Sequence, residues 1–542
     1  MKIISHALLG FLALSGFQLS YSDDCVPWRN EFAVKNNLLI GDIDISAGDI
    51  FDLKKAKESG TIHRLANKIH VQTKTSIIRN QLLFSKGEHF EQKKLAESER
   101  NLRKQRYIKS ASIKPYLLCG SQVNIRIKTQ DNWTLTPGLS FSRQGGENRS
   151  GIAIEEHNLF GLGKSLSFNY KKDAKRDSKL FSYENPQLFG TRNRLVLDLQ
   201  DNSDGAGYGL TLERPFYELD SKYSWGFNAS KLKQATTLYK AGVIDDKITE
   251  EKQNTSIFYG WSKRPHEISE ISKSNKVLRF KVGWTINKID FLKSTRDPQF
   301  KKTSLRESYP WIEYNSLNEN YIKKTNYKTM GKIEDVSLGR SFTVGVGLLN
   351  KAFGSDDNQL KISAKYSKGY ALKGNTLGFL SVASKAYLGS GKRQGETISF
   401  QGDIDHFNKK GNDFSLKAKF KIANNLTLNE QLVLGGGVGL RAYPIAYQTG
   451  NKSILLQAEK RIHFDWYPLH LVKFGAVIFA DAGTAWGEGN DAKMMADIGV
   501  GLRLFPTRSS TGKTIHINLA TPLVDRNKVN KYQFSIGTSQ TF

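Results

Sequence analysis

Residues 278–287 read LRFKVGWTIN, so an apolar side chain stands at Leu278 and at every second position as far as Ile286. Successive side chains of a β-strand point to opposite faces of the sheet, so this two-residue period predicts a strand with one apolar and one polar face. The same alternation recurs in four further segments, residues 166–170, 195–199, 414–422 and 515–519. From about Trp133 to the C-terminus, we therefore expect an all-β domain.

The polar faces of these segments carry more Lys and Arg than a packed core tolerates, so we expect them to face water. Alternating segments of about ten residues, separated by turn-rich stretches, are typical of a transmembrane β-barrel whose polar face lines the lumen. A soluble β-sandwich or propeller also has alternating strands, but several segments here reach the length of about 9–11 residues that a tilted spanning strand needs. We expect 16 antiparallel strands, with up to 20 allowed by the segment count.

The composition excludes several other classes of protein. The chain has 542 residues, 11% of them aromatic, which excludes a disordered protein. After the first twenty residues no run of 18 apolar residues occurs, which excludes a helical multi-pass membrane protein. The net charge of +28 suggests nucleic-acid binding. The strand parity instead places many cations in a lumen and its rim, where they would attract acidic polypeptide or lipid phosphate, so we expect no nucleic-acid partner. Five of these cations are Arg279, Lys281, Lys417, Lys419 and Lys421.

Residues 1–22 have the features of a secretory signal peptide. Ala7–Leu14 is a short apolar stretch, and the small residues Ser20 and Ser22 stand three and one positions before the expected cleavage site at Asp23. A buried N-terminal helix is the alternative interpretation. Export favours the barrel over a soluble sandwich and argues further against nucleic acid.

The chain has two cysteines, Cys25 and Cys119. In an oxidising compartment they could form a disulfide, and the alternative is two unpaired thiols, because the sequence alone does not show that they meet. There is no CxxC motif and no Cys/His cluster with the spacing of metal ligands, so we expect neither a metal site nor a cofactor.

Residues 27–130 mix helical and strand patterns. Three strands and two helices are expected there, in the order β-α-α-β-β: Leu38–Ile45, Ile77–Phe84, Glu91–Arg106, Ser110–Tyr116 and Gln122–Lys128. About 100 residues in this order are enough for one small α+β domain.

Residues 434–444 read LGGGVGLRAYP, a glycine-rich stretch with a single arginine, Arg441. Phosphate binding is disfavoured because neither a Lys-Ser/Thr pair nor a helical pattern follows. Further along, the strand parity puts Glu459 and Asp481 on the lumen side. They are either solvated or paired with a cation from a loop, and the planar guanidinium of arginine suits such a site.

Together these motifs resemble the BamA/TamA/FhaC-type superfamily of outer-membrane assembly and secretion barrels, the bacterial surface antigen family. The loop residues resemble its (V/L)-R-G-(F/Y) motif, with alanine where glycine is usual: Gly439, Leu440, Arg441, Ala442, Tyr443 and Pro444. The inner-wall residues resemble its E-x-R and F-x-D-x-G strand motifs: Glu459, Phe479, Asp481 and Gly483. The terminal Phe542 resembles its C-terminal insertion signal, and residues 23–130 resemble one POTRA domain, fewer than most members carry.

The resemblance implies three parts: a signal peptide at 1–22, a periplasmic POTRA-like domain at 23–130 and an outer-membrane barrel at 131–542. It implies that Arg441 folds into the lumen and pairs with Asp481 and Glu459. It also implies a monomeric barrel of a Gram-negative outer membrane, in contact with lipid and lipopolysaccharide, that inserts or translocates unfolded polypeptides.

Two alternatives stay open beside polypeptide insertion. One is a two-partner secretion pore for a single exoprotein. Another is a passive porin, which needs neither a POTRA domain nor a lumen loop. An outer-membrane enzyme is not expected, because the ten histidines and the lack of a GxSxG motif offer no catalytic set.

Overall fold

A computed structural model describes residues 25–34, 37–55, 60–263, 276–391, 395–487 and 489–539. The expected signal peptide, its cleavage site and Phe542 lie outside these residues. Within them, no helix is long and apolar enough to cross a membrane.

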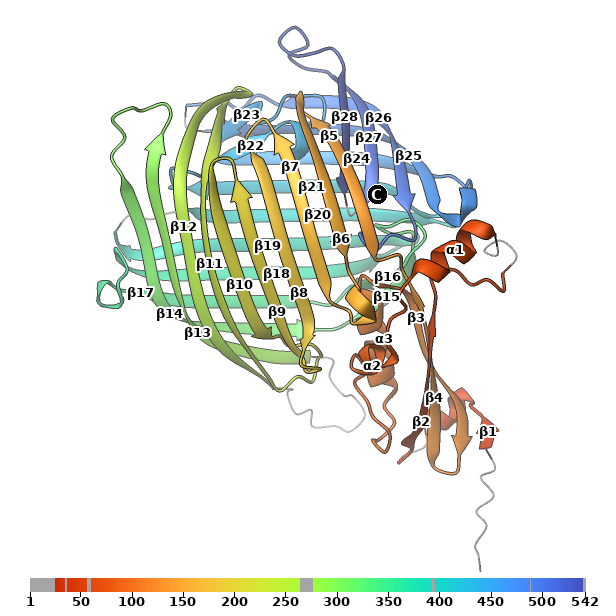
Figure 1. The fold of residues 1–542 in the computed structure, drawn as a ribbon. Coiled ribbons are helices and arrows are strands. Elements are labelled where there is room, and N and C mark those ends of the chain that lie inside the picture. Colours follow the sequence, from red (N-terminus) through yellow and green to blue (C-terminus); the bar gives the residue numbers. More distant parts are fainter. Residues whose placement is uncertain are drawn as a thin grey trace, which may run out of the picture.

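In the described residues, 20 antiparallel strands close into one barrel (Figure 1). The first ten strands are β5 (Leu135–Gln144), β6 (Glu147–Glu156), β7 (Ser165–Asp173), β8 (Asp177–Leu188), β9 (Asn193–Asn202), β10 (Gly205–Arg214), β11 (Tyr223–Lys240), β12 (Val243–Lys263), β13 (Lys276–Ser294) and β14 (Thr303–Asn318). The other ten are β17 (Ser341–Leu349), β18 (Asn358–Leu372), β19 (Thr376–Ser390), β20 (Glu396–Asn408), β21 (Gly411–Asn424), β24 (Lys452–His463), β25 (Val472–Trp486), β26 (Met495–Pro506), β27 (Thr514–Pro522) and β28 (Gln533–Ser539).

The expectation of 16 strands is therefore wrong, and the upper bound of 20 is the observed number. The local alternation identifies a strand but does not say whether that strand pairs within the barrel wall or in a loop hairpin. β11–β14 illustrate the difficulty, because they are 16–21 residues long and so exceed a single membrane crossing.

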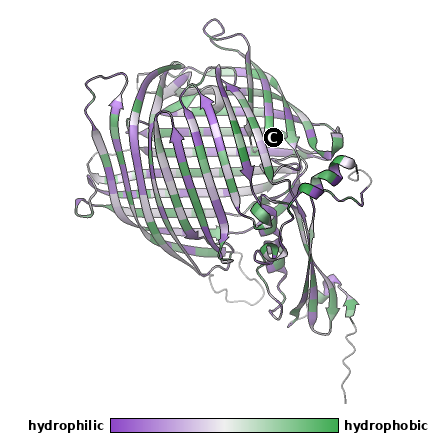
Figure 2. Ribbon diagram, in the orientation of Figure 1, coloured by the Kyte–Doolittle hydropathy of each residue, from purple (hydrophilic) through white to green (hydrophobic). Residues whose placement is uncertain are grey.

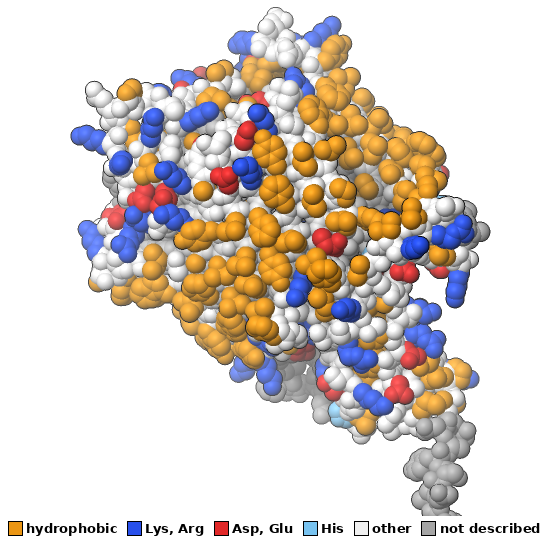
Figure 3. All heavy atoms as spheres, in the orientation of Figure 1, with side chains coloured by type: hydrophobic (Ala, Val, Ile, Leu, Met, Phe, Trp, Pro, Cys, Tyr) orange, Lys and Arg blue, Asp and Glu red, His pale blue; other side chains and the backbone are white. Residues whose placement is uncertain are grey.

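The outer face of the barrel is apolar, as the two-residue period predicts. Ile257, Ile312, Ile398, Ile478 and Val500 are each more than half exposed on it. Figure 3 shows apolar side chains gathered over the visible face of the outer wall, and Figure 2 shows hydrophobic residues along the strands of that wall. A continuous apolar band of this kind suits contact with lipid chains.

The N-terminal unit consists of a four-stranded sheet and three α-helices. Its strands are β1 (Cys25–Pro27), β2 (Leu39–Gly48), β3 (Ile108–Cys119) and β4 (Gln122–Asp131), in the order β1-β3-β4-β2, and β2 runs parallel to β4. Its helices are α1 (Thr61–Ile69), α2 (Thr75–Arg79) and α3 (Gln92–Lys104). The sequence expectation missed α1 and overestimated α2, which ends at Arg79.

The sheet and helices of this unit enclose a small apolar core. Ile40, Leu95, Leu102, Ile125 and Ile127 are almost fully buried in it. At the edge of the sheet, β1 pairs with β3, which sets Cys25 opposite Cys119, and the two are joined by a disulfide with a Cα–Cα distance of 4.2 Å. The bridge ties the first described strand to the sheet.

Two small hairpins lie outside the barrel wall. One is β15 (Tyr321–Thr325) with β16 (Ile333–Ser337), inserted between β14 and β17. The other is β22 (Leu432–Leu434) with β23 (Gln448–Gly450), within the long connection between β21 and β24. The described residues also contain five short 3-10 helices: Asn30–Val34, Leu159–Gly161, Lys351–Phe353, Gly436–Val438 and Pro468–His470.

Candidate functional site

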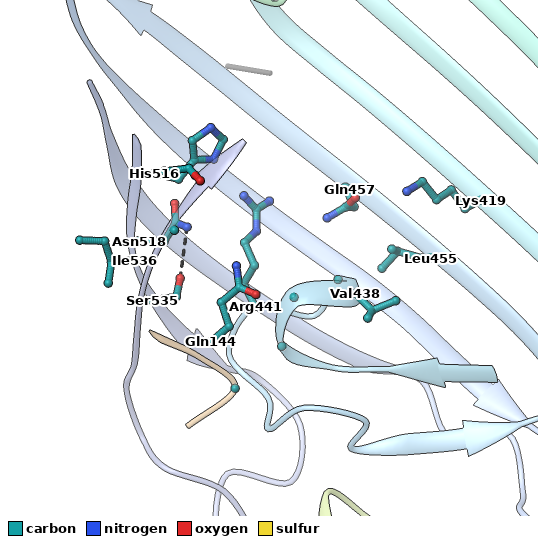
Figure 4. Close-up of a pocket in the computed structure, with 16 residues that line it drawn as sticks. Gln144, Lys419, Val438, Arg441, Leu455, Gln457, His516, Asn518, Ser535 and Ile536 are labelled. Carbon is teal, nitrogen blue, oxygen red and sulfur yellow. Dashed lines mark hydrogen bonds between the residues drawn. The ribbon is translucent and has the colours of Figure 1, made fainter. Parts of the chain in front are cut away.

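The connection between β21 and β24 carries the arginine motif, and it folds against the inner wall of the barrel (Figure 4). Gly435 and Gly439 have positive φ angles of 121° and 103°. A Cβ at Gly435 would lie 2.2 Å from the carbonyl oxygen of Pro444, and one at Gly439 would lie 2.4 Å from Leu455. The glycines of this stretch therefore allow a close approach between the loop and the wall, rather than binding a phosphate.

Arg441 is held by two carboxylates of the wall. Its Nε and Nη2 donate to Asp481 Oδ2 and Oδ1 at 2.7 and 2.8 Å, and its Nη1 donates to Glu459 Oε1 at 2.8 Å. The guanidinium carbon lies 3.5 Å from the centre of the Phe479 ring. The side chain of Asp481 is fully buried and that of Arg441 is 15% exposed, so both charges are largely removed from water. A bidentate contact plus a second carboxylate uses the full planar fork of the guanidinium.

Three more charged side chains surround this contact. Arg461 donates to Glu459 at 2.9 Å from Nη2. Asp497 lies opposite Asp481 in the β25–β26 register, and its Oδ2 accepts the backbone N–H of Ala442 at 3.2 Å. Arg503 is completely buried, and its Nη1 donates to Asn518 at 2.8 Å. Three arginines thus gather with three acidic side chains in this part of the lumen.

The sequence reasoning did not single out Asp497 and Arg503. The signal was present, because Asp497, Gly499, Gly501 and Arg503 share one parity in a strand whose other face holds Ile498, Val500 and Leu502. The same parity argument that placed Asp481 in the lumen would have placed both.

Tyr443 fixes the loop at its other end. Its ring is fully buried, and its hydroxyl lies 2.9 Å from the carbonyl oxygens of both Ala496 and Val524. Ala442, where the superfamily motif usually has glycine, is buried in the same apolar cluster, so its methyl group fills space there. Gly483, on the barrel wall, packs against Leu434 of the loop. A Cβ added at Gly483 would lie 3.4 Å from the Leu434 side chain.

The loop also touches the seam where the first and last strands of the barrel meet. The backbone N–H of Ile445 donates to the carbonyl oxygen of Gly145, in the β5–β6 turn, at 3.3 Å. A cavity of about 400 Å³ separates the loop from β28. Figure 4 shows its lining, which includes Gln144, Lys419, Arg441, His516, Asn518 and Ser535.

The seam itself is weakly paired. In the part of the chain that the structure describes, β28 and β5 share one registered pair, Ile536 opposite Arg143. By contrast, β27 and β28 share seven, and β5 and β6 share ten.

At the barrel end next to the N-terminal unit, the β15–β16 hairpin packs against the wall. Tyr327 is buried beside Phe407, and its hydroxyl donates to Asp405 at 3.1 Å. Asn326 Nδ2 donates to the carbonyl oxygen of Lys410 at 2.6 Å. The tip residue Met330 belongs to the apolar cluster that also holds the arginine loop, so hairpin and loop meet inside one core.

Helix α3 holds this hairpin by ion pairs. Arg103 Nε and Nη2 donate to the two oxygens of Asp335 at 2.8 and 2.7 Å, and Arg103 also donates to Glu99. Glu99 accepts from Lys323 at 2.7 Å, and Arg100 pairs with Glu319 at 3.0 Å.

These contacts shift the ionisation of Glu99. Burial acts to raise its pKa, but the hydrogen bonds from Lys323 and the Ile113 N–H and the charge of Arg103 outweigh burial and lower it. The N-terminal unit is thus linked electrostatically to an element inside the barrel end.

Comparison with known families finds one match: the model of the Omp85 superfamily domain matches residues 158–542. Among curated proteins, none matches the chain.

Solved structures resemble the chain at low identity. CdiB from Acinetobacter baumannii is 14% identical with a TM-score of 0.44, over 95% of this chain and 76% of that one. BamA from Haemophilus ducreyi lacking POTRA domains 1–3 is 14% identical with a TM-score of 0.39, over 95% and 89% of the two chains. CdiB from Escherichia coli is 10% identical with a TM-score of 0.36, over 95% and 92%.

Proposed function

Because the chain belongs to the Omp85 superfamily, we propose that it inserts or translocates polypeptides at the bacterial outer membrane, with its N-terminal unit in the periplasm. In this proposal the N-terminal unit is a single POTRA-type domain that captures a client segment. The barrel then passes the client into the membrane through the seam between β5 and β28. The observation that carries the proposal is the weak pairing of that seam.

A strand edge inside a membrane leaves backbone N–H and C=O groups without partners, which costs several kcal/mol for each group. Closed barrels avoid this cost by a continuous ladder of hydrogen bonds. Here the ladder among the described residues is reduced to one registered pair at Ile536 and Arg143. The seam is therefore where the wall opens at the least cost, and an incoming client strand can add to the exposed edge by β-augmentation.

The N-terminal unit offers an edge of the same kind. β2 is the outer strand of its sheet, and only its first residues are covered, where Ile40 exchanges hydrogen bonds with Gly87 and Glu88. Over Asp42–Ala47 no further strand pairs with that edge in the described ranges. An extended client segment could pair there before it reaches the barrel.

The lumen is a less direct route. The arginine loop occupies it beside the seam, and the β15–β16 hairpin closes against the same core from the N-terminal end. A secretion pore would have to move both elements. A passive porin would gain nothing from either element, which disfavours that alternative.

The test is to lock the seam with a disulfide. Arg143→Cys with Ile536→Cys joins β5 to β28 across the one registered pair. The matched control, Ile517→Cys with Ile536→Cys, joins β27 to β28, which are already paired. Each variant replaces the wild-type chain in cells, and the amounts of folded outer-membrane proteins and of secreted proteins are measured with and without reductant.

We expect the seam lock to lower the folded outer-membrane proteins, reductant to restore them, and the control to behave as wild type. A seam-locked protein that supports wild-type levels of both sets of proteins would refute passage through the seam. Loss of one secreted protein, with outer-membrane proteins unchanged, would instead favour the two-partner secretion alternative.

A further inference from the structure

Helix α1 has its apolar face turned away from the protein. Ile62, Leu65 and Ile69 recur at the spacing of one helix face and are 56%, 56% and 59% exposed. Leu53, in the segment that precedes the helix, and Val71, two positions after its last residue, are also exposed. A surface helix of a soluble domain buries its apolar stripe against the core, so this arrangement is the reverse of the usual one.

The face of α1 that contacts the protein is polar. The His63 ring is buried, and its Nε2 lies 2.9 Å from the carbonyl oxygen of Leu469, in the turn between β24 and β25. Asn67 exchanges two hydrogen bonds with the backbone of Phe51, at 2.8 and 3.1 Å. These bonds fix the rotation of the helix, so the exposed apolar face is a consequence of specific docking.

The apolar face continues the lipid-facing band of the barrel. The turn that receives His63 exposes Phe464, Trp466 and Leu469, and Trp466 stacks on Phe474 at 4.4 Å between ring centres. Ile462 and Ile478, on the two strands that the turn connects, are exposed on the outer wall. Figure 1 places α1 beside the end of β25. Tryptophan at the end of a spanning strand marks the boundary between hydrocarbon and headgroups.

The remaining face of α1 is basic. Arg64 and Lys68 are exposed and lie on the side of the helix away from Ile62. Cations flanking an apolar stripe are the pattern of helices that lie in a membrane interface, where the apolar side chains enter the acyl region and the cations meet phosphate groups.

We propose that α1 lies in the headgroup region of the membrane leaflet at this end of the barrel and binds phospholipid through Ile62, Leu65 and Ile69. The helix then holds the N-terminal unit beside β24 and β25, with the unit's sheet directed away from the bilayer. This role needs only a barrel set in a membrane, and it is independent of whether polypeptides pass through the seam or the lumen.

Site-specific fluorescence in vesicles tests the proposal. The full chain is reconstituted in phosphatidylethanolamine and phosphatidylglycerol, with an environment-sensitive fluorophore on Ile62→Cys in one sample and on Arg64→Cys in the other. Cys25 and Cys119 are joined and do not react. Both labelled positions are exposed and two residues apart, so the pair reports which face of the same helix meets lipid.

We expect spin-labelled phospholipid to quench the fluorophore at position 62 about twofold or more over that at position 64, and aqueous iodide to show the reverse order. Equal iodide quenching at the two positions, without lipid quenching, would overturn the proposal. Shielding of position 62 from iodide without lipid quenching would overturn it as well, because a second copy of the chain would then cover the face.

A second variant guards against a folding defect. This variant carries Ile62→Gln, Leu65→Gln and Ile69→Gln together. The three replaced side chains are exposed, and glutamine favours a helix, so the barrel should keep its heat-modifiable band. In this variant, iodide should quench a fluorophore at Arg64→Cys at least as strongly as it does in the parent protein. If the triple variant keeps every lipid contact of the parent, as read by spin-label quenching at Val71→Cys, the apolar face does not bind lipid.

Discussion

Replacing Arg441 with alanine should release the arginine loop from the barrel wall. The change removes three charged hydrogen bonds of 2.7–2.8 Å and leaves the fully buried Asp481 without its guanidinium. Breaking a buried ion pair by removing one partner costs about 3–5 kcal/mol, because the remaining charge stays desolvated. At about 1.4 kcal/mol for each factor of ten, the docked loop should become about a hundredfold to several thousandfold less favoured.

Heat-modifiability provides the assay, since a folded barrel and an unfolded one migrate differently in a gel. Arg441→Ala should unfold at a lower temperature than wild type and should lower activity, while the N-terminal unit stays folded. The matched control is Arg149→Ala. Arg149 pairs with Asp173 at 3.0 Å but is 55% exposed, so its loss should cost below about 1 kcal/mol.

Two further variants locate the cause of the effect. Arg441→Lys keeps the charge but loses the planar fork, so it should fall between wild type and Arg441→Ala. Adding Asp481→Asn to Arg441→Ala removes the uncompensated carboxylate and should recover part of the loss. Arg441→Ala with the unfolding temperature and activity of Arg149→Ala would refute the reasoning.

Three more predictions concern the N-terminal unit. Arg103→Ala should free the β15–β16 hairpin from α3, seen as faster proteolysis within the hairpin, whereas Asp335→Asn should have a smaller effect because Glu99 still pairs with Arg103. The folded state lowers the pKa of Glu99 from its ordinary 4.5, so the ion pairs of Glu99 stabilise the docked hairpin above about pH 4.5, and this stabilisation is lost as the pH falls further. Glu99→Gln should remove this pH dependence of the protection of the hairpin from proteolysis. Cys25→Ser with Cys119→Ser should destabilise the unit by about 4.7 kcal/mol at most, which is the chain entropy of closing a loop over a separation of 94 residues. The measurement is urea unfolding followed at the N-terminal unit, and an unchanged midpoint would contradict this.

The candidate site could be predicted in part because strand parity is a local property. The alternation of residues 452–463 and 472–486 determines that Glu459 and Asp481 share the lumen face, whatever the rest of the chain does. Their joint contact with Arg441 joins positions 18 and 40 residues apart through a loop, and the sequence suggested it only through resemblance to a family. The buried Arg503 shares the lumen parity of Asp497 in its strand, but strand parity alone does not predict its contact with Asn518.

Helix α1 was missed for a different reason. Its apolar positions do recur at helical spacing, but the helix has only nine residues. The contact that turns His63 inward is made with the backbone carbonyl oxygen of Leu469, 406 positions further along the chain. Nothing in residues 61–69 alone indicates that the polar face turns inward.

The sequence by itself determined the strands, their lipid and lumen faces, and the residues that carry charge into the lumen, because the period of two follows from the geometry of each strand. The tertiary structure decided that 20 strands close the barrel, that the seam keeps one registered pair among the described residues, and that Arg103 reaches Asp335 across 232 positions. Barrel closure and the docking of the N-terminal unit depend on contacts between residues far apart in the sequence. The free energy of each such contact depends on how the rest of the chain folds, so no local sequence pattern encodes it.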